Sequence, residues 1–138
     1  MQCEKLVLLL QDLECGGTQR YAINLLRHID RERFSPQLWV LREGLFYQEE
    51  IDNLAIEPKV LSEARRANPL SFYRLFKLLR QEKPHILYNL TVLPNVWGRM
   101  VGWLCKVPII IGGYRNTYPA QLEWLLWRLA DRVICNAK

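Results

Sequence analysis

The chain has 138 residues, of which 50% are hydrophobic and 24% are charged, so it is long enough to bury a core and too apolar to be disordered. Its net charge of +5 favours anionic partners such as phosphorylated ligands or acidic lipid surfaces. No basic run is longer than Arg65-Arg66 and no nucleic-acid-binding motif is present, so we expect no nucleic-acid partner.

Cysteine spacing and hydropathy indicate in which cellular compartment the protein is expected. The four cysteines are scattered, with neither C-x-x-C spacing nor nearby histidines, which predicts reduced thiols in a cytoplasmic protein and no bound metal. Leu6–Leu10 is too short for a signal peptide, and Arg99 and Lys106 interrupt the best candidate for a membrane span. We therefore expect a soluble protein that is at most peripheral to a membrane.

The first predicted unit organises the rest of the chain. The uniform apolar run Leu6–Leu10 predicts a strand covered on both faces of a parallel sheet. Gly16 and Gly17 follow it, before an amphipathic helix that extends to about Ile29, and this order places backbone N–H groups at the carboxyl end of the strand. Arg20 lies in the first turn, where a cation opposes the helix dipole, so we expect it to face an anion.

Strands and helices then alternate to the end of the chain. Hydrophobic runs and Gly/Pro signals predict further strands at 37–41, 58–61, 85–90, 107–111 and 132–136. Helical spacing is found around 47–54, from Pro69 to Glu82, from Pro94 to Leu104 and after Pro119. The pattern predicts one domain over residues 1–138, an α/β fold with a Rossmann-like doubly wound parallel sheet and helices on both faces.

Two helical segments carry expectations about burial. In the helix after Pro94, the predicted core stripe consists of Trp97, Met100, Val101 and Leu104. In the last helix, the predicted core face consists of Leu122, Leu125, Leu126 and Leu129, which places Trp124 and Trp127 on the opposite side. Two exposed tryptophans could pack against a second domain, form a dimer contact or rest at a membrane interface.

The candidate site collects the residues that directly follow the strands, because ligands of open α/β sheets bind beyond the carboxyl ends. Arginines, backbone amides and neutral hydrogen-bonding side chains would suit a sugar or polyol phosphate. The residues collected in this way are Asp12, Gly16, Gly17, Thr18, Arg20, Asn89, Thr91, Asn95, Gly113, Tyr114, Arg115, Asn116, Thr117 and Asn136.

Several chemistries are excluded by pattern. The glycine loop has neither the G-x-G-x-x-G dinucleotide fingerprint nor a P-loop, and no serine lies in a nucleophile elbow. The two histidines, His28 and His85, fall on a polar helix face and at the start of a strand, as ordinary surface histidines do. The sequence alone holds no complete catalytic set.

Four stretches, in this order, resemble the family-4 glycosyltransferases. The first is the apolar strand followed by Gly16–Arg20, and the second is Asn95–Arg99 with Lys106–Ile110. The third is Gly112–Asn116, and the fourth is Ala130–Lys138. Each stretch alone is weakly specific, but four in the right order cover essentially the whole chain.

The resemblance implies a GT-B architecture, in which two Rossmann-like domains enclose the active site. The chain matches only the N-terminal, acceptor-binding domain, so we expect a truncated GT-B fold without the C-terminal nucleotide-sugar domain. Such enzymes transfer a sugar from a nucleotide-sugar with retention and without a required metal. The resemblance therefore implies no cofactor beyond the nucleotide-sugar donor.

The resemblance also assigns roles to individual residues. Gly16 and Gly17 would approach the donor diphosphate, with Thr18 and Arg20 nearby. The acceptor side would be lined by Asn89, Thr91, Asn95, Arg115 and Asn116. Two departures stand out: Ala137 replaces a common serine, and Asn89-Leu90-Thr91 stands where many members have a histidine, which argues against a histidine-dependent step.

The expected function is the acceptor-binding half of a hexosyltransferase acting on a saccharide, polyol or lipid-linked acceptor, of the kind that builds cell-envelope polysaccharide. Half a cleft cannot enclose a transition state, so we expect no sugar transfer by this chain alone. Arg65, Arg66, Arg74 and Lys77 could hold an anionic membrane at its inner face or could simply be solvated. The alternative is a stand-alone interaction module that pairs with a partner or with itself.

Overall fold

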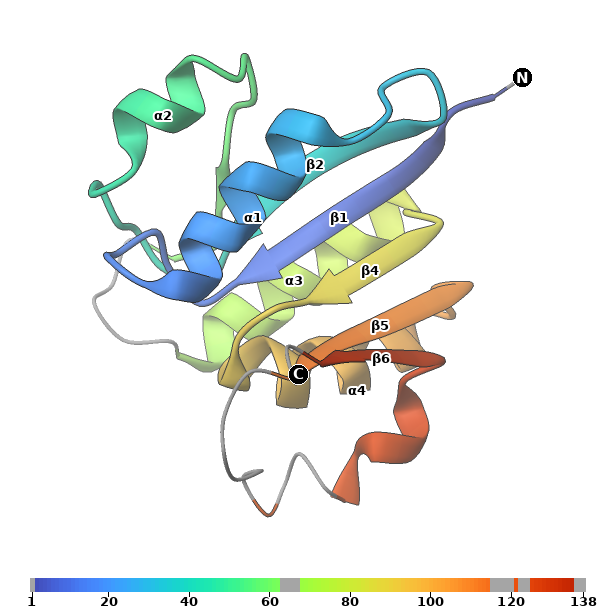
Figure 1. Cartoon of the computed structure of the whole chain (residues 1–138). Coiled ribbons are helices and arrows are strands. Elements are labelled where there is room, and N and C mark those ends of the chain that lie inside the picture. Colours follow the sequence, from blue (N-terminus) through green and yellow to red (C-terminus); the bar gives the residue numbers. More distant parts are fainter. Residues whose placement is uncertain (1, 63–67, 115–120, 122–124, 136–138) are drawn as a thin grey trace.

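The computed structural model describes residues 2–62, 68–114, 121 and 125–135. In this part of the chain, six parallel strands form one sheet in the order β3-β2-β1-β4-β5-β6 (Figure 1). This is the doubly wound order, in which the direction of winding switches between β1 and β4. The strands are β1 (Glu4–Leu10), β2 (Phe34–Val40), β3 (Lys59–Val60), β4 (Ile86–Asn89), β5 (Ile109–Tyr114) and β6 (Arg132–Cys135).

Helices cover both faces of the sheet, as predicted. Figure 1 shows α1 on one side of β1 and β2, with α3 and α4 on the other side. A π-helical turn, η1, leads directly into α4, and a short 3₁₀ turn, η2, precedes β6. The bounds are α1 (Gly17–His28), α2 (Gln48–Asp52), α3 (Pro69–Glu82), η1 (Pro94–Gly98), α4 (Arg99–Leu104) and η2 (Trp127–Leu129).

The central strand β1 supplies both cores. Its side chains from Leu6 to Leu10 are all buried, and they alternate between the two faces of the sheet. Leu8 and Leu10 pack with the α1 side, whereas Leu9 packs with the α3 and α4 side. The uniform apolar run was therefore correctly interpreted as a strand covered on both faces.

Helix α3 has the predicted bounds because its ends carry local signals. Asn68 caps the first turn, since its side chain accepts a hydrogen bond from the Ser71 N–H at 3.0 Å, and Pro69 occupies the first helical position. The helix ends at Lys83, whose backbone is left-handed with φ 46° and ψ 58°, and Pro84 follows. A left-handed end of this kind usually has glycine, because other L-residues are strained there.

We expect Lys83→Gly to raise the free energy of unfolding by about 1 kcal/mol, because glycine adopts the left-handed conformation without the steric cost that lysine carries. Urea denaturation measures the change. Lys77→Gly, in the middle of the same helix, is the matched control and should lower stability by a similar amount. A loss of stability in Lys83→Gly would contradict the assignment of strain to this position.

The second strand was predicted at 37–41, with Phe34-Ser35-Pro36 before it, but it begins three residues earlier. These residues belong to β2, where Pro36 lies opposite Leu6 of β1. On its other side, β2 pairs with β3 only at Trp39 and Val40, so the described sheet leaves one side of Pro36 without a neighbouring strand. A proline without an N–H group is tolerated at such an edge position.

The predicted stripe in the helix after Pro94 was wrong at Leu104, which is 58% exposed. Val101 is buried, Met100 is half-buried, and Trp97 is half-buried and stacks on Phe72 with ring centroids 4.2 Å apart. The π-helical turn η1 contains more residues than an α-helical turn, so the positions after it depart from regular helical spacing, and α4 ends at Leu104.

In the described part of the last helical segment, Gln121 and Leu125 are helical, and the 3₁₀ turn η2 follows before β6. Leu125 is 67% exposed, although it was predicted to face the core. Trp127 is 58% exposed, which agrees with its predicted outward position. Leu122 and Trp124 lie outside the described residues, as do Arg65 and Arg66.

Candidate functional site

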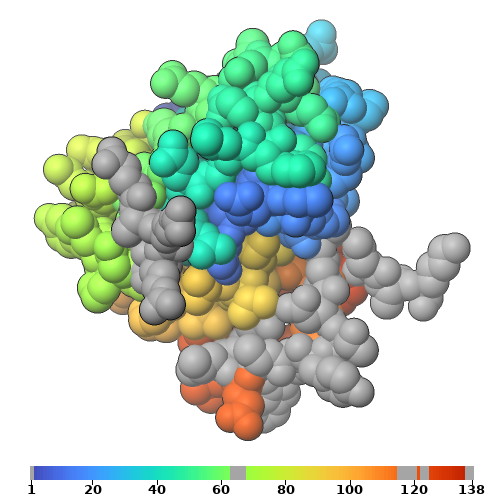
Figure 2. All heavy atoms as spheres, turned by 90° about the vertical axis from the view of Figure 1, so that its left-hand side faces the viewer, coloured from blue at the N-terminus to red at the C-terminus, as the bar shows by residue number. Residues whose placement is uncertain are grey.

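The candidate site lies at the edge of the sheet where the strands end. The switch point between β1 and β4 opens a crevice at this edge in doubly wound sheets. Figure 2 looks onto it: the blue segment after β1 lies between the cyan-to-green segment that contains α2 and the yellow segment that follows β4. The loops that were predicted to hold the ligand-binding residues after β1 and β4 therefore meet here.

The glycine loop follows β1 at this edge. Gly16 is the N-terminal cap of α1, and its carbonyl accepts a hydrogen bond from the Tyr47 hydroxyl at 3.3 Å. Gly17 is exposed, and a Cβ atom added to it would meet nothing within 4 Å among the described residues. Gly17 begins a twelve-residue helix, and the unpaired N–H groups of a helix start are an arrangement that suits an anion.

The rest of the loop is held by the side chain of Asp12, which is only 5% exposed. One of its oxygens, Oδ2, accepts hydrogen bonds from Arg42 at 2.5 and 2.9 Å, and the other, Oδ1, accepts one from the Gln19 side chain at 3.1 Å. Asp12 was predicted as a ligand-binding residue, but these contacts instead make it a brace of the loop. The sequence held no signal for Arg42 as its partner.

Arg20 faces an anion, as its place in the first turn of α1 suggested, but that anion belongs to the chain itself. Its guanidinium donates to both carboxylate oxygens of Glu50 at 3.0 and 2.9 Å and lies 5.5 Å from the ring centroid of Tyr47. Arg27 contacts the same carboxylate at 3.4 Å. A ligand phosphate near Arg20 would have to compete with Glu50 or share the cation with it.

The predicted amide residues after β4 point inward. Asn89 and Asn95 are 0% and 2% exposed, and Asn95 donates to the Gly113 carbonyl at 2.7 Å. Thr91 is half-buried, and its hydroxyl accepts a hydrogen bond from the Gln11 N–H at 2.9 Å. Asn89 and Asn95 are therefore held inside the fold and do not line the carboxyl edge openly.

Sequence reasoning missed a buried arginine in this cluster. Arg99 is 3% exposed, donates to the Asn95 side chain at 3.2 Å, and occupies the space that a Cβ atom on Gly112 would need. The signal that could have found it was its position four residues after Asn95, which places both side chains on one helix face. Buried cations are costly unless hydrogen-bonded, so Arg99 belongs to the support of the crevice.

Other predicted residues cannot be compared with the structure. Arg115, Asn116, Thr117 and Asn136 lie outside the described residues. Thr18 is half-buried in the glycine loop. Within the described ranges, no group of three His, Cys, Asp or Glu side chains could hold a metal ion.

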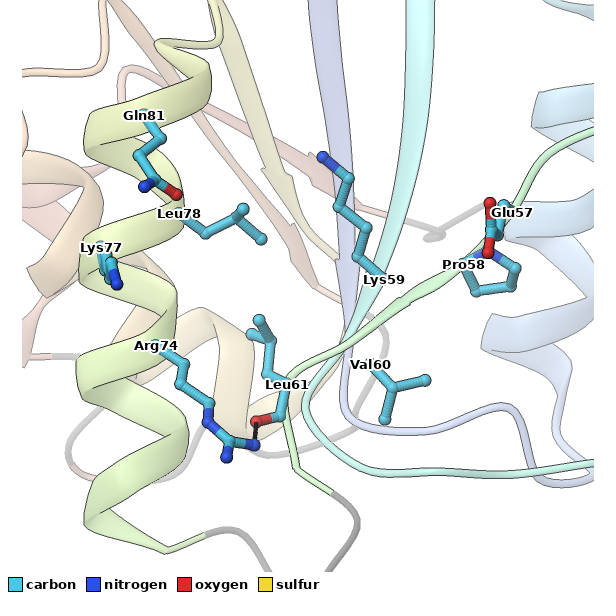
Figure 3. Close-up of a pocket in the computed structure, with 9 residues that line it drawn as sticks. All are labelled: Glu57, Pro58, Lys59, Val60, Leu61, Arg74, Lys77, Leu78 and Gln81. Atoms are coloured by element: carbon cyan, nitrogen blue, oxygen red, sulfur yellow. Dashed lines mark hydrogen bonds between the residues drawn. The ribbon is translucent and has the colours of Figure 1, made fainter.

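A hollow of about 620 Å³ lies beside β3 and α3, away from the glycine loop (Figure 3). It is lined by both charge signs, with Glu57 on one wall and Lys59, Arg74 and Lys77 on the others. Arg74 donates to the Leu61 carbonyl at 2.9 Å, drawn as a dashed line in Figure 3. Part of its positive charge is therefore already engaged within the chain.

Glu82 accepts a hydrogen bond from the Lys59 ammonium at 2.8 Å. This bond, with the charges of Lys59 and Lys5, keeps the pKa of Glu82 below its ordinary value of 4.5 although burial acts in the opposite direction. A carboxyl with a lowered folded-state pKa stabilises the protein above its unfolded-state pKa. That stabilisation is lost as the pH falls through the folded-state pKa.

We therefore expect Glu82→Gln to destabilise the protein at neutral pH and the difference from the unmodified chain to shrink below about pH 4.5. Urea midpoints measured from pH 7 to pH 3 give the comparison. Glu57→Gln is the control, since no ion pair within the described residues involves Glu57. A difference that stays constant over this pH range would rule out the ion pair as its source.

The chain resembles one sequence family and several solved structures. The sequence profile described as Glycosyltransferase Family 4 matches residues 15–138. No curated protein matches the chain.

No helix of the described residues has the length and apolar character required to cross a membrane.

Three solved structures share the fold at low sequence identity. Alr3699/HepE from Anabaena, in complex with UDP-glucose, has a TM-score of 0.73 and 15% identity over 96% of this chain and 37% of its own. MurG from Acinetobacter baumannii has a TM-score of 0.75 and 11% identity over 98% of this chain and 41% of its own. The apo form of the lipopolysaccharide outer core galactosyltransferase WaaB has a TM-score of 0.64 and 11% identity over 94% of this chain and 38% of its own. The chain thus spans about two fifths of the length of these structures.

Proposed function

Because the chain belongs to Glycosyltransferase Family 4, we propose that it forms the acceptor-binding half of a retaining glycosyltransferase. In this proposal, a second domain carries the nucleotide-sugar and closes over the crevice at the carboxyl edge. The fold matches the N-terminal half of GT-B glycosyltransferases, of which it covers about 40%. The sugar would pass to a saccharide, a polyol or a lipid-linked acceptor, with no cofactor other than the nucleotide-sugar.

The observation that carries the proposal is the open space at Gly17. A side chain there would meet no described residue within 4 Å, so no contact in the described part of the chain explains the glycine. An external group that approaches the backbone closely would explain it. HepE was crystallised with UDP-glucose, and a diphosphate of that type matches the N–H groups and the dipole at the start of α1.

The buried polar cluster fits the same proposal. Asn95 holds the Gly113 carbonyl, and Arg99 fills the space beside Gly112. The carboxyl end of β5, which directly precedes Arg115 and Asn116 in the sequence, is therefore held by two side chains, and such support suits a binding site. Arg115 and Asn116 remain the proposed acceptor-side residues of this loop.

A peripheral membrane position on the cytoplasmic side would suit a lipid-linked acceptor and synthesis of cell-envelope polysaccharide. Arg74 and Lys77 are exposed on α3 and carry the charge that an anionic headgroup attracts. This part of the proposal rests on composition and charge. Flotation of the chain with anionic and with neutral vesicles tests membrane binding. Equal recovery of the chain with both kinds of vesicle would contradict binding to an anionic membrane.

Sugar transfer is the direct test of the enzyme assignment. The 138-residue chain alone should release no sugar from UDP-glucose, because half a crevice cannot exclude water or align two substrates. The same residues joined to a nucleotide-sugar domain should transfer sugar. Arg20→Ala in that longer protein then tests the donor side, and unchanged activity would remove Arg20 from the site.

A second function, an interaction module, is favoured by exposed apolar side chains outside the crevice. Trp103, Leu104, Leu125 and Trp127 are each at least 58% exposed, and exposed apolar groups of this size usually mark a contact surface. Light scattering decides whether the chain self-associates. A stable dimer together with no transfer in any two-domain form would favour the module over the enzyme.

A further inference from the structure

A second hollow lies at the opposite edge of the sheet, where β4 and β5 begin. Its volume is about 590 Å³, within the usual range for small-ligand sites. Its walls are mixed, and their apolar part includes Leu79, Pro84, Leu104 and Val107. Of the described residues that line it, none is acidic and four are basic: Arg80, Lys83, His85 and Lys106.

The basic side chains have no acidic partner in the described part of the chain. None of the five ion pairs found there involves Arg80, Lys83 or Lys106. Like charges around one hollow repel one another, and no acidic side chain is among the described residues that line it, so positive potential is concentrated there. In the hollow of Figure 3, by contrast, Glu57 is part of the wall and Glu82 binds the Lys59 ammonium.

Two of the cations occupy strained backbone positions. Lys83 has φ 46° at the end of α3, and Lys106 has φ 56° shortly after α4. The helix dipole explains a cation close to each helix end, but it does not explain lysine at the left-handed residue itself, where glycine is less strained. Strain retained at two neighbouring connections indicates a use for the side chains.

The remaining two basic groups are oriented by contacts. The Nδ1 atom of the His85 ring accepts a hydrogen bond from the Lys5 N–H at 3.1 Å. In the neutral ring the proton is therefore on Nε2, which can donate a hydrogen bond. The Arg80 guanidinium lies over the Phe76 ring, 5.6 Å from its centroid. The pKa of the Cys105 thiol in this hollow is raised by burial, and the charge of Arg80 acts against that rise.

We infer that this hollow is an anion site that binds a phosphate group, separate from the glycine loop and independent of sugar transfer. Ammonium and guanidinium donors around one hollow match the oxygens and the charge of phosphate. The phosphate could belong to a soluble phosphorylated molecule or to an anionic lipid. The recognition chemistry is the same for both sources.

The test titrates the ¹⁵N-labelled chain with inorganic pyrophosphate and, in a second arm, measures sedimentation with phosphatidylglycerol or phosphatidylcholine vesicles. The variant K83G/K106G removes two cations while it relieves backbone strain, so its thermal midpoint should rise. The control R33A/R128A removes the same charge from exposed positions outside the hollow. A structural role for the two lysines would lower the midpoint of K83G/K106G.

We expect pyrophosphate to shift the amide signals of residues 83, 85 and 104–107. We expect its affinity to fall by about tenfold in K83G/K106G and to change less than about twofold in the control. If pyrophosphate does not bind but phosphatidylglycerol vesicles do, with the same loss in K83G/K106G, the phosphate is that of a lipid. Equal weakening in both double variants, or no binding in either arm, would overturn the inference.

Discussion

Gly98→Ala is expected to lower the free energy of unfolding by about 2 to 3 kcal/mol, because the new methyl group has no room. A Cβ atom on Gly98 would overlap the Asn89 side-chain oxygen and would lie 3.0 Å from the Leu9 Cδ2 atom. Asn89 and Leu9 are both fully buried, so neither can move aside into solvent. Urea denaturation followed by circular dichroism measures the loss.

The chain offers a control and a rescue for this prediction. Gly17→Ala adds the same methyl group where no described residue lies within 4 Å, so stability should change by less than about 0.5 kcal/mol. The double variant Asn89→Ala/Gly98→Ala removes the overlapping oxygen and should recover part of the loss, which a double-mutant cycle quantifies. Equal effects of Gly98→Ala and Gly17→Ala would contradict the close packing of η1 on β4.

Gly17→Val is expected to lower kcat/KM for sugar transfer by about a hundredfold in a protein that joins these residues to a nucleotide-sugar domain, with no loss of folding stability. The valine side chain would occupy the open space through which a diphosphate approaches the N–H groups at the start of α1. Steady-state kinetics with UDP-glucose as donor, together with a thermal melt, separate the two effects.

Asn24→Val is the matched control for this prediction. It places the same side chain on an exposed position of the same helix, two turns beyond the glycine loop, and should leave kcat/KM within about twofold. Full activity of Gly17→Val would mean that no substrate approaches the loop. A comparable loss in Asn24→Val would point to a change in α1 as a whole.

Local signals account for the parts of the fold that the sequence predicts well. The uniform run Leu6–Leu10 identified a central strand, and Asn68, Pro69 and Lys83-Pro84 mark both ends of α3. These signals act through neighbours in the chain, so they are visible without the tertiary structure. The alternation of such units was sufficient to predict a doubly wound parallel sheet.

The errors arise where distant residues decide the outcome. A π-helical turn from Pro94 to Gly98 precedes α4, in which Leu104 is exposed against expectation, and regular helical spacing does not indicate such a turn. Asn89 ends β4 and Asn95 lies in η1, as their place in the chain near the end of a strand suggested. Both side chains are buried, and burial of this kind depends on packing with residues that are distant in sequence. Likewise, the partner of Arg20 is Glu50, 30 residues away.

The central claim is that the glycine loop after β1 faces the phosphates of a nucleotide-sugar, and selective labelling tests it most directly. The chain has seven glycines, so ¹⁵N-glycine labelling gives a spectrum in which the loop is read separately from the core. Titration with millimolar UDP-glucose should shift the signals of Gly16 and Gly17 and leave those of Gly98 and Gly102 in place. Unchanged loop signals, or equal shifts at all four positions, would contradict the claim.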